Sequence, residues 1–206
     1  MNIKAVPITA ILIFACSIMT AQAGDKYLFY MNGCCIEKLG TDGYETIAKK
    51  LEETGLKLDF TIRKEDTDEA VMGSVDSVVE KVNALLANGT PPEDITVSGF
   101  SLGSVIAMYA SVRIANPKVN YVLLAGCPGP KARRHIDDYS KVQGRILSIT
   151  DVGDNKFVSC SDKITNASEF KEIKLESGKG HKVFRLPKDK FIELWKDPLV
   201  NWAHGK

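Results

Sequence analysis

The segment that most constrains this chain is Ile95 to Gly103, which reads Ile-Thr-Val-Ser-Gly-Phe-Ser-Leu-Gly and runs straight into the apolar stretch 104–115. The pattern predicts a short buried strand, a tight turn that carries Ser101, and a helix that begins at once. A Gly-x-Ser-x-Gly turn of this kind needs small residues two positions either side of the serine. The serine backbone is strained there, and larger neighbouring side chains would collide.

Gly99 and Gly103 meet this requirement. The predicted helix directs its N-terminal amides and the positive end of its dipole at whatever Ser101 attacks. The N–H of Leu102 is placed to bind an oxyanion. The pattern alone would describe an ordinary glycine-rich turn, but with a strand before it and a helix after it we expect a serine nucleophile for acyl transfer.

The N-terminus has the pattern of a secretory signal. Lys4 supplies a positive charge, 5–18 is apolar, and Ala21-Gln22-Ala23 is a small-x-small cleavage site. The apolar run is too short to predict a membrane span. We therefore expect a signal peptide at 1–23, a single domain at 24–206, and a secreted or periplasmic location. A second interpretation is a lipoprotein signal in which Cys16 is lipidated and anchors the chain.

Charge argues against nucleic acid as a partner. The formal net charge is +1, and removal of Lys4 with the signal leaves a neutral chain. A nucleic-acid-binding domain would need a basic face. The basic residues near 131–134 are interpreted as a solvated helix end.

The cysteines favour disulfides. Of the five in the sequence, four lie beyond the signal: Cys34, Cys35, Cys127 and Cys160. An even number in an exported protein is typical of a disulfide framework, although the pairing cannot be read from the sequence. Neither a Cys-x-x-Cys spacing nor a Cys/His cluster predicts a zinc site, and we expect no metal.

Strands and helices alternate along the chain. Strands are predicted over 27–31, 56–62, 95–100, 119–124, 145–150 and 170–175, and helices over 44–53, 69–87, 104–115, 131–141, 156–163 and about 188–202. This alternation predicts an α/β three-layer sandwich with a mainly parallel sheet of about six strands. Functional loops in such sheets leave the carboxyl ends of the strands.

A serine nucleophile needs a base, and histidine is the usual one near neutral pH. The chain has three histidines: His135, His181 and His204. His135 lies in a charged segment before the candidate acids, and His204 lies near the C-terminus. His181 follows a strand on a glycine-bounded loop at the functional edge of the sheet, so we expect it to be the base.

The base in turn needs a carboxylate that fixes its tautomer. Asp151 and Asp154 both follow the strand 145–150. The loop spacing favours Asp154, which stands further from the strand end, and leaves Asp151 as the alternative acid or as a turn-capping residue.

The order Ser101, Asp154, His181, with the turn written Gly99-Phe100-Ser101-Leu102-Gly103, resembles the α/β-hydrolase superfamily over nearly the whole chain beyond the signal. The resemblance implies that the strand 27–31 lies between the strand 56–62 and the strand 95–100. The later strands are then added in sequence on the other side. Members usually carry His-Gly where this chain has Asn32-Gly33, and the resemblance assigns the second oxyanion donor to the Cys34 amide.

The resemblance is to a small, minimal form of that fold. The two leading strands of larger members are missing, and the short connection 127–145 leaves little room for a lid. We expect an open site for small, soluble or flexible acyl substrates. The implied topology makes the strands ending near Cys127 and Cys160 neighbours, so a disulfide between them is expected.

Cys34 and Cys35 are adjacent in the sequence. A vicinal disulfide is strained, so we expect these cysteines to be free or one of them to pair elsewhere. A thiol nucleophile at Cys34 is a rival to Ser101, although no helix starts directly behind it.

The function expected from these features is an exported serine hydrolase of the carboxylesterase or thioesterase kind. It would cleave a small-molecule ester or thioester through an acyl-enzyme, with no metal or organic cofactor. A peptidase or amidase would use the same groups. The alternative is a hydrolase-fold binding protein without turnover, with a lipid anchor at Cys16 as an option.

Overall fold

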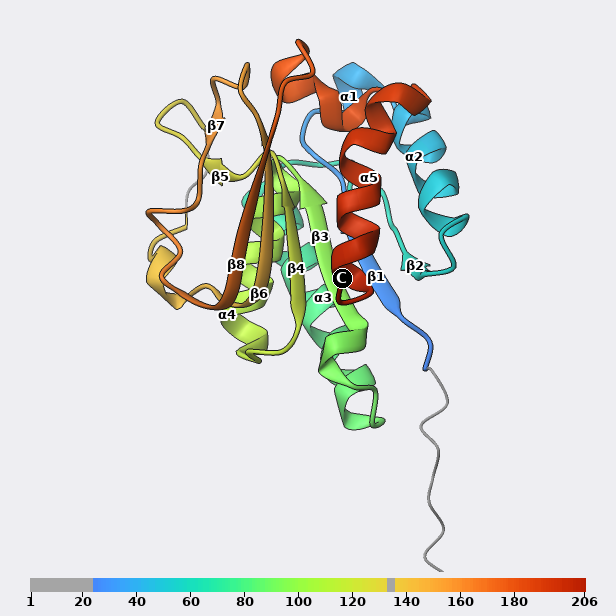
Figure 1. Cartoon of the computed structure of the whole chain (residues 1–206), viewed down its shortest axis with the longest axis vertical. Helices are drawn as coiled ribbons and strands as arrows, with labels where there is room; N and C mark the ends of the chain where they lie inside the picture. The colour runs from blue at the N-terminus through green and yellow to red at the C-terminus, as the bar shows by residue number, and fades with distance from the viewer. Residues whose placement is uncertain (1–23, 133–135) are drawn as a thin grey trace, which may run out of the picture.

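A computed structural model describes residues 24–132 and 136–206 (Figure 1). At its centre lies a six-stranded parallel sheet with the strand order β2-β1-β3-β4-β6-β8. The strands are β1 (Tyr27–Met31), β2 (Lys57–Asp59), β3 (Ile95–Phe100), β4 (Asn120–Leu124), β6 (Gln143–Asp151) and β8 (Asn166–Leu175). The expected α/β sheet and its strand order are confirmed, including β1 between β2 and β3.

The register brings the carboxyl ends of the strands to one edge. Met31 of β1 pairs with Gly99 of β3, and Leu124 of β4 pairs with Ile149 of β6. All pairs are parallel, so the loops after β1, β3, β6 and β8 leave from this same edge. In Figure 1 it is the upper edge of the sheet.

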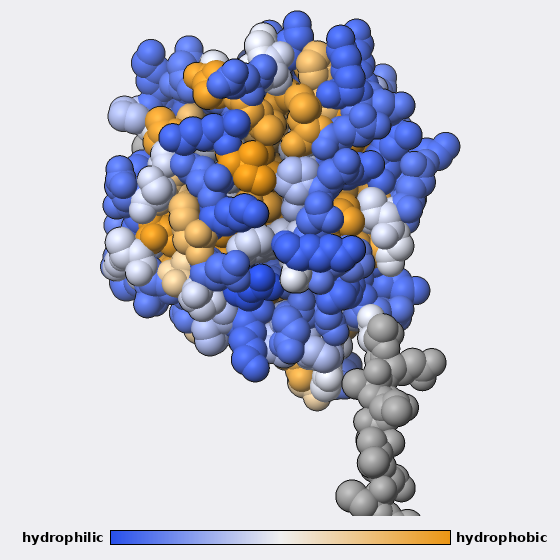
Figure 2. Space-filling view, in the orientation of Figure 1, coloured by the Kyte–Doolittle hydropathy of each residue, from blue (hydrophilic) through white to orange (hydrophobic). Residues whose placement is uncertain are grey.

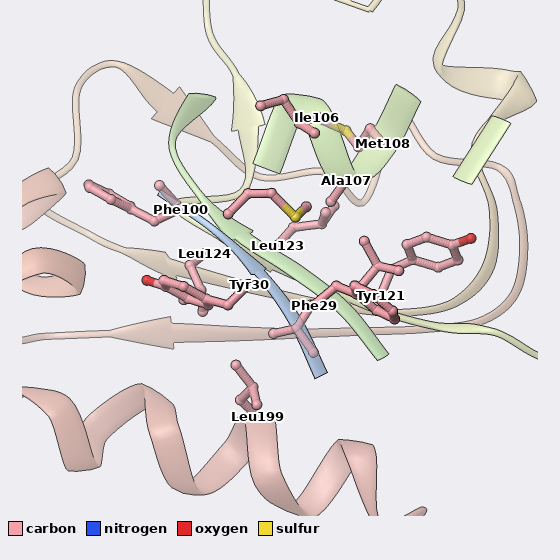
Figure 3. Packing of buried hydrophobic residues seen from close by; sticks show 14 of the residues in the cluster. Phe29, Tyr30, Phe100, Ile106, Ala107, Met108, Tyr121, Leu123, Leu124 and Leu199 are labelled. Carbon is pink, nitrogen blue, oxygen red and sulfur yellow. The ribbon is translucent and has the colours of Figure 1, made fainter. Parts of the chain in front are cut away.

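Helices cover both faces of the sheet (Figure 1). On one face lie α2 (Asp42–Glu52) and α5 (Asp189–Ala203), and on the other lie α3 (Asp68–Ala87) and α4 (Leu102–Ile114). Figure 3 shows the packing, with Leu199 of α5 on one side of the strands and Ile106 and Met108 of α4 on the other. These three side chains are fully buried. The result is the three-layer sandwich that the sequence predicted.

α4 is buried nearly all round, which explains its uniformly apolar sequence. Helices that are hydrophobic on every side pack in the interior of a domain. Contacts on both flanks, with α3 and with β3 and β4, enclose it. The serine turn therefore stands on an element that is fixed on all sides.

Shorter elements complete the fold. They are α1 (Ile36–Leu39), the two-stranded antiparallel pair β5 (Cys127–Pro128) and β7 (Phe157–Val158), and the 3₁₀ turns η1 (Pro92–Asp94), η2 (Tyr139–Lys141) and η3 (Gly180–Arg185). In the view of Figure 2 hydrophilic side chains predominate, and hydrophobic ones gather mainly in the upper half, toward the edge where the strands end.

Two predicted helices are wrong. The segment 156–163 forms β7 followed by a turn, because the Asp154 carboxylate binds the amides of Lys156 and Phe157 and a disulfide fixes Cys160. In the connection 131–141, the described residues contain only the short turn η2, whose Ser140 amide is capped by Asp138. In both places local side-chain bonds to the backbone compete with helix formation.

Several expectations fall outside the described residues. They are the signal peptide at 1–23 with Cys16, and His135. Within 24–132 and 136–206, the helices are all too short or too polar to cross a membrane.

Candidate active site

Ser101 lies at the junction of β3 and α4. Its backbone has φ 57° and ψ −113°, outside the regions that L-residues normally occupy. The Ser101 N–H donates to the Leu124 carbonyl at 2.9 Å, and the side chain of Ser104 donates to the carbonyls of Gly99 and Leu124. These bonds hold the strained turn against β4, and strain maintained in this way is typical of functional sites.

Gly99 and Gly103 are required by close backbone approach. A Cβ at Gly99 would lie 2.2 Å from the carbonyl carbon of Gly103. A Cβ at Gly103 would lie 2.2 Å from the Met31 carbonyl oxygen and 3.0 Å from that of Asn32. The same glycine that permits the turn therefore brings the end of β1 against the first turn of α4.

His181 connects Ser101 to Asp154. Its Nε2 is 3.0 Å from the Ser101 Oγ, and its Nδ1 is 2.6 Å from the Asp154 Oδ2. The imidazole packs against two rings, with centroid distances of 4.9 Å to Phe100 and 5.1 Å to Phe157. Contacts on both nitrogens and with both rings fix the orientation of the imidazole.

Asp154 is enclosed. Its side chain has no exposed surface, and its second oxygen accepts the N–H groups of Lys156 at 2.8 Å and Phe157 at 3.1 Å. A carboxylate held by backbone amides on one oxygen presents the other in a fixed direction. Here that direction is toward His181.

Asp151 does not contact His181. Its oxygens accept the N–H of Gly153 at 2.9 Å and the N–H and hydroxyl of Ser177, which join the loop after β6 to the loop after β8. Burial alone would raise the pKa of Asp151, but these bonds, with the Ser177 hydroxyl foremost, outweigh it and hold the pKa below the ordinary value. Asp151 thus has the turn-capping position expected if Asp154 is the acid.

The other histidine that the structure describes lies elsewhere. His204 follows α5, and burial together with the charges of Lys26 and Lys206 lowers its pKa. Since Lys26 immediately precedes β1, this histidine lies near the amino edge of the sheet, opposite Ser101.

The two expected oxyanion donors belong to adjacent elements. Leu102 is the first residue of α4, and Cys34 lies in the loop Asn32–Cys35 that follows β1. In this loop the Gly33 N–H donates to the Tyr44 hydroxyl at 3.0 Å and the Cys35 N–H donates to Asp66 at 2.7 Å. Within the described residues, the N–H groups of Leu102 and Cys34 have no hydrogen-bond acceptor.

The expectation for Cys34 and Cys35 is wrong, because the two form a disulfide with each other. The backbone at Cys35 is left-handed, with φ 70° and ψ 34°, and this sharp turn lets neighbouring side chains meet. A bonded sulfur is not a thiolate, so Cys34 is not the rival nucleophile in this structure. Cys34, Cys35 and Asp66 also form a cluster of metal-ligand types within 4.8 Å, but the sulfurs are engaged in the disulfide.

The second disulfide, Cys127–Cys160, is the one expected. It joins β5 to the loop after β7, beside the antiparallel pairing of Cys127 with Val158. β7 includes Phe157, which packs against His181. The disulfide therefore braces a segment that supports the imidazole.

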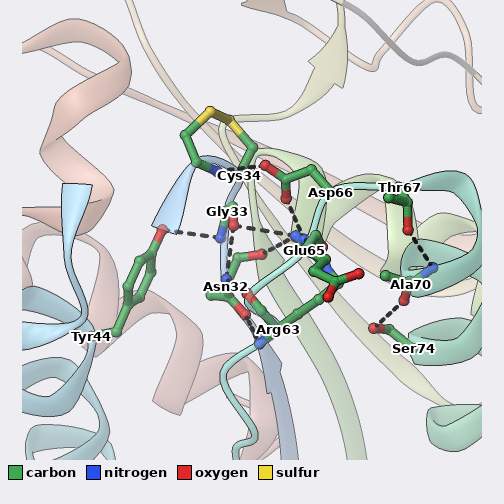
Figure 4. A network of polar contacts seen from close by, with 11 residues as sticks. Asn32, Gly33, Cys34, Tyr44, Arg63, Glu65, Asp66, Thr67, Ala70 and Ser74 are labelled. Atoms are coloured by element: carbon green, nitrogen blue, oxygen red, sulfur yellow. Dashed lines mark hydrogen bonds and ion pairs between the residues drawn. A yellow bond between two sulfur atoms is a disulfide. The ribbon is translucent and has the colours of Figure 1, made fainter. Parts of the chain in front are cut away.

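Sequence reasoning missed the residues that support the Asn32–Cys35 loop. Figure 4 shows Tyr44, Arg63 and Asp66 converging on it from α2 and from the segment after β2. Burial raises the pKa of Tyr44 to about 12, so its hydroxyl remains neutral when it accepts the Gly33 N–H. The only signal in the sequence was the i, i+3 spacing of Arg63 and Asp66, which is common on surfaces.

No protein-family model and no curated protein matches this sequence. Solved structures do match. SOBER1 of Arabidopsis thaliana is 15% identical, with a TM-score of 0.53, 88% of this chain covered and 99% of that chain. A carboxylesterase from Mesorhizobium loti is 15% identical, with a TM-score of 0.52 and coverage of 85% and 88%.

A third match is a putative dienelactone hydrolase from Klebsiella pneumoniae subsp. pneumoniae MGH 78578, 10% identical, with a TM-score of 0.59 and coverage of 91% and 90%. At these identities the likeness concerns the fold. Together with the strand order and the turn at Ser101, it shows that the chain has the α/β-hydrolase fold.

Proposed function

We propose that this protein is an exported serine hydrolase that cleaves a carboxyl ester or thioester. The observation that carries the proposal is the hydrogen-bonded series Ser101–His181–Asp154, with distances of 3.0 Å and 2.6 Å. Both distances lie within the range expected for a nucleophile, its base and the group that orients the base.

In the proposed reaction, the Ser101 Oγ attacks the acyl carbonyl carbon while the His181 Nε2 takes the hydroxyl proton. Asp154 holds the Nδ1 proton and stabilises the imidazolium. The tetrahedral intermediate collapses, the leaving alcohol or thiol takes the proton from Nε2, and Ser101 retains the acyl group. Water then attacks the acyl-enzyme while the His181 Nε2 takes its proton. The second tetrahedral intermediate collapses, the Ser101 Oγ takes the proton back from Nε2, and the acid is released.

The oxyanion of each tetrahedral intermediate would be bound by the N–H groups of Leu102 and Cys34. Both lack other acceptors among the described residues, and the positive end of the α4 dipole adds to the stabilisation. Removal of one such donor typically lowers kcat by about 10²–10³-fold.

The substrate class follows from what surrounds the serine. The connection between β4 and β6 contributes only β5 and the short turn η2 among its described residues, so that described part contains no lid domain. A site without a lid domain would suit small, soluble or flexible acyl groups. The matched protein from Mesorhizobium loti is a carboxylesterase, and another match is a cold-adapted esterase from an Arctic intertidal metagenomic library, which supports ester cleavage over other acyl transfers.

The proposal includes export: residues 1–23 act as a cleaved signal peptide and 24–206 form the mature single domain. The two disulfides are compatible with an oxidising compartment. In the lipoprotein alternative, Cys16 would instead retain the protein at a membrane.

The first test is intact-mass detection of a fluorophosphonate adduct on the mature protein, beside the variants Ser101→Ala and His181→Ala. A single adduct on the wild type is expected, with none on Ser101→Ala and strongly reduced labelling on His181→Ala, since the alcohol needs its base. Short-chain p-nitrophenyl esters and thioesters then give the substrate preference.

The absence of an adduct on folded, oxidised wild-type protein would refute the serine mechanism. It would favour a hydrolase-fold binding protein without turnover. Labelling without ester or thioester cleavage, but with cleavage of an amide, would retain the mechanism and move the substrate to the peptidase or amidase class.

A further inference from the structure

The loop Asn32–Cys35 is held by a network that the reaction scheme above does not use. The guanidinium of Arg63 donates from Nη2 to the Gly33 carbonyl at 3.2 Å and to the Asn32 carbonyl at 3.4 Å (Figure 4). The Arg63 side chain is only 7% exposed. A buried cation directed at two loop carbonyls fixes the orientation of those peptide groups.

Asn32 fastens the loop to the segment that carries Arg63. Its Nδ2 donates to the Arg63 carbonyl at 3.0 Å, and its Oδ1 accepts the Arg63 N–H at 2.8 Å. Nδ2 also donates to the Gly33 carbonyl at 2.8 Å. Asn32, which stands where members of the resembled superfamily usually carry a histidine, is therefore a structural link between β1 and the residues after β2.

Asp66 joins the other side of the loop to the same arginine. One carboxylate oxygen accepts the Cys35 N–H at 2.7 Å, and the other forms an ion pair with the Arg63 Nη1. Because the pair is neutral as a whole, it holds the loop without adding net charge beside a developing oxyanion.

The contacts on either side of Cys34 isolate a single donor. Gly33 directs its N–H to Tyr44, and Cys35 directs its N–H to Asp66, so between them the Cys34 N–H is left without an acceptor in the described part of the chain. The loop also starts at Asn32, whose carbonyl lies close to Gly103 in the first turn of α4.

We propose that Arg63 and Asp66 are positioning residues: they hold the Asn32–Cys35 loop so that the Cys34 N–H remains available to the oxyanion. This inference rests on the proposed serine hydrolase function. On this proposal, the ion pair of Arg63 and Asp66 raises the rate of the chemical step although it does not contact the substrate.

The test compares Asp66→Ala, Asp66→Asn and Arg63→Lys with the wild type, using a chromogenic short-chain ester. Prolonged fluorophosphonate titration gives the concentration of reactive serine, and kcat is referred to that concentration. Asp66→Ala and Arg63→Lys are expected to lower kcat about 10- to 100-fold with KM nearly unchanged, because a donor displaced by a fraction of an ångström acts mainly on the transition state.

Asp66→Asn provides the graded comparison. The amide oxygen can still accept the Cys35 N–H, so its kcat is expected to lie between those of the wild type and Asp66→Ala. Asp59→Ala is the matched control, since it removes the exposed ion pair between Asp59 of β2 and Lys81 without touching the loop. Its kcat and KM are expected to equal those of the wild type.

Thermal unfolding of each variant separates misfolding from misplacement. If Asp66→Ala does not fold, the kcat values of Asp66→Asn and Arg63→Lys test the positioning role. Wild-type kcat per titrated serine in the folded variants, or a change in KM alone, would overturn the positioning role while the serine mechanism stands. A wild type that neither reacts with fluorophosphonate nor cleaves the ester would refute the proposed function, and this inference with it.

Discussion

Asp151 is the last residue of β6 and Asp154 follows it three residues later, yet the two carboxylates have different partners. Asp154 turns one oxygen to His181 and the other to backbone amides, whereas Asp151 binds Gly153 and Ser177. The difference lies in what each carboxylate contacts, since both are buried beside the same loop.

The variants Asp154→Asn and Asp151→Asn are therefore expected to separate activity from stability. Asp154→Asn should lower kcat about 10⁴-fold by fixing the wrong imidazole tautomer. Asp151→Asn should retain most of kcat but lower the free energy of unfolding by about 2 kcal/mol, because hydrogen bonds to a charged acceptor are weakened. Ester hydrolysis and urea unfolding of both variants measure the two effects, and a reversed pattern would exchange their roles.

The pH dependence of stability gives a second test of Asp151. Its pKa in the folded protein lies below the ordinary value of 3.8, so its stabilising effect is present above that pH and is lost as the pH falls through the lowered pKa. The difference in unfolding free energy between wild type and Asp151→Asn should then be largest near neutrality and shrink in acid. If the difference in unfolding free energy did not change with pH, the lowered pKa of Asp151 would not be a source of stability.

At the scale of elements, two glycines in helices have opposite expected responses to alanine. Gly103 in α4 has no room, since a Cβ would lie 2.2 Å from the Met31 carbonyl oxygen, whereas Gly73 in α3 has nothing within 4 Å. Gly103→Ala should lower the unfolding free energy by more than about 3 kcal/mol through backbone displacement. Gly73→Ala should raise it by about 0.5–1 kcal/mol through reduced chain entropy. Urea denaturation of the two variants provides the comparison.

The Cys34–Cys35 disulfide closes the loop that carries the proposed oxyanion donor. The double variant Cys34→Ser/Cys35→Ser removes this constraint on the left-handed turn at Cys35. We expect kcat to fall about 10-fold, less than for loss of a whole donor, since the Asp66 and Tyr44 contacts remain. The measurement is kcat of the wild type and of the variant, each before and after treatment with a dithiol. The dithiol should lower kcat of the wild type to that of the variant. It should leave kcat of the variant unchanged if reduction of the remaining Cys127–Cys160 disulfide does not affect kcat.

For the whole molecule, the Cys127–Cys160 disulfide closes the larger loop, with a sequence separation of 33 residues. Its removal in Cys127→Ala/Cys160→Ala should lower the unfolding free energy by about 3–4 kcal/mol, chiefly by freeing the unfolded chain. Denaturant unfolding under oxidising conditions measures this loss. Equal stability of the variant and the wild type would show that the disulfide is dispensable for the fold.

The sequence by itself determined the class of fold and predicted the residues that make up the candidate site. Alternating strand and helix patterns predicted the parallel sheet, and Gly99, Ser101 and Gly103 predicted the strained turn, because these signals depend on residues close together in the chain. The position of His181 on a loop after the last strand also favoured it over His204, and in the structure its Nε2 lies 3.0 Å from the Ser101 Oγ.

Only the tertiary structure decided how distant segments meet. The network of Arg63 and Asp66 on the loop after β1 has no local pattern, and the pairing of Cys34 with Cys35 depends on one left-handed residue. The helix predicted over 156–163 failed for a local and a distant reason: the Asp154 carboxylate binds the nearby amides of Lys156 and Phe157, and a disulfide joins Cys160 to the distant Cys127. Contacts between segments far apart in sequence override weak helical preferences, and they also complete the candidate site.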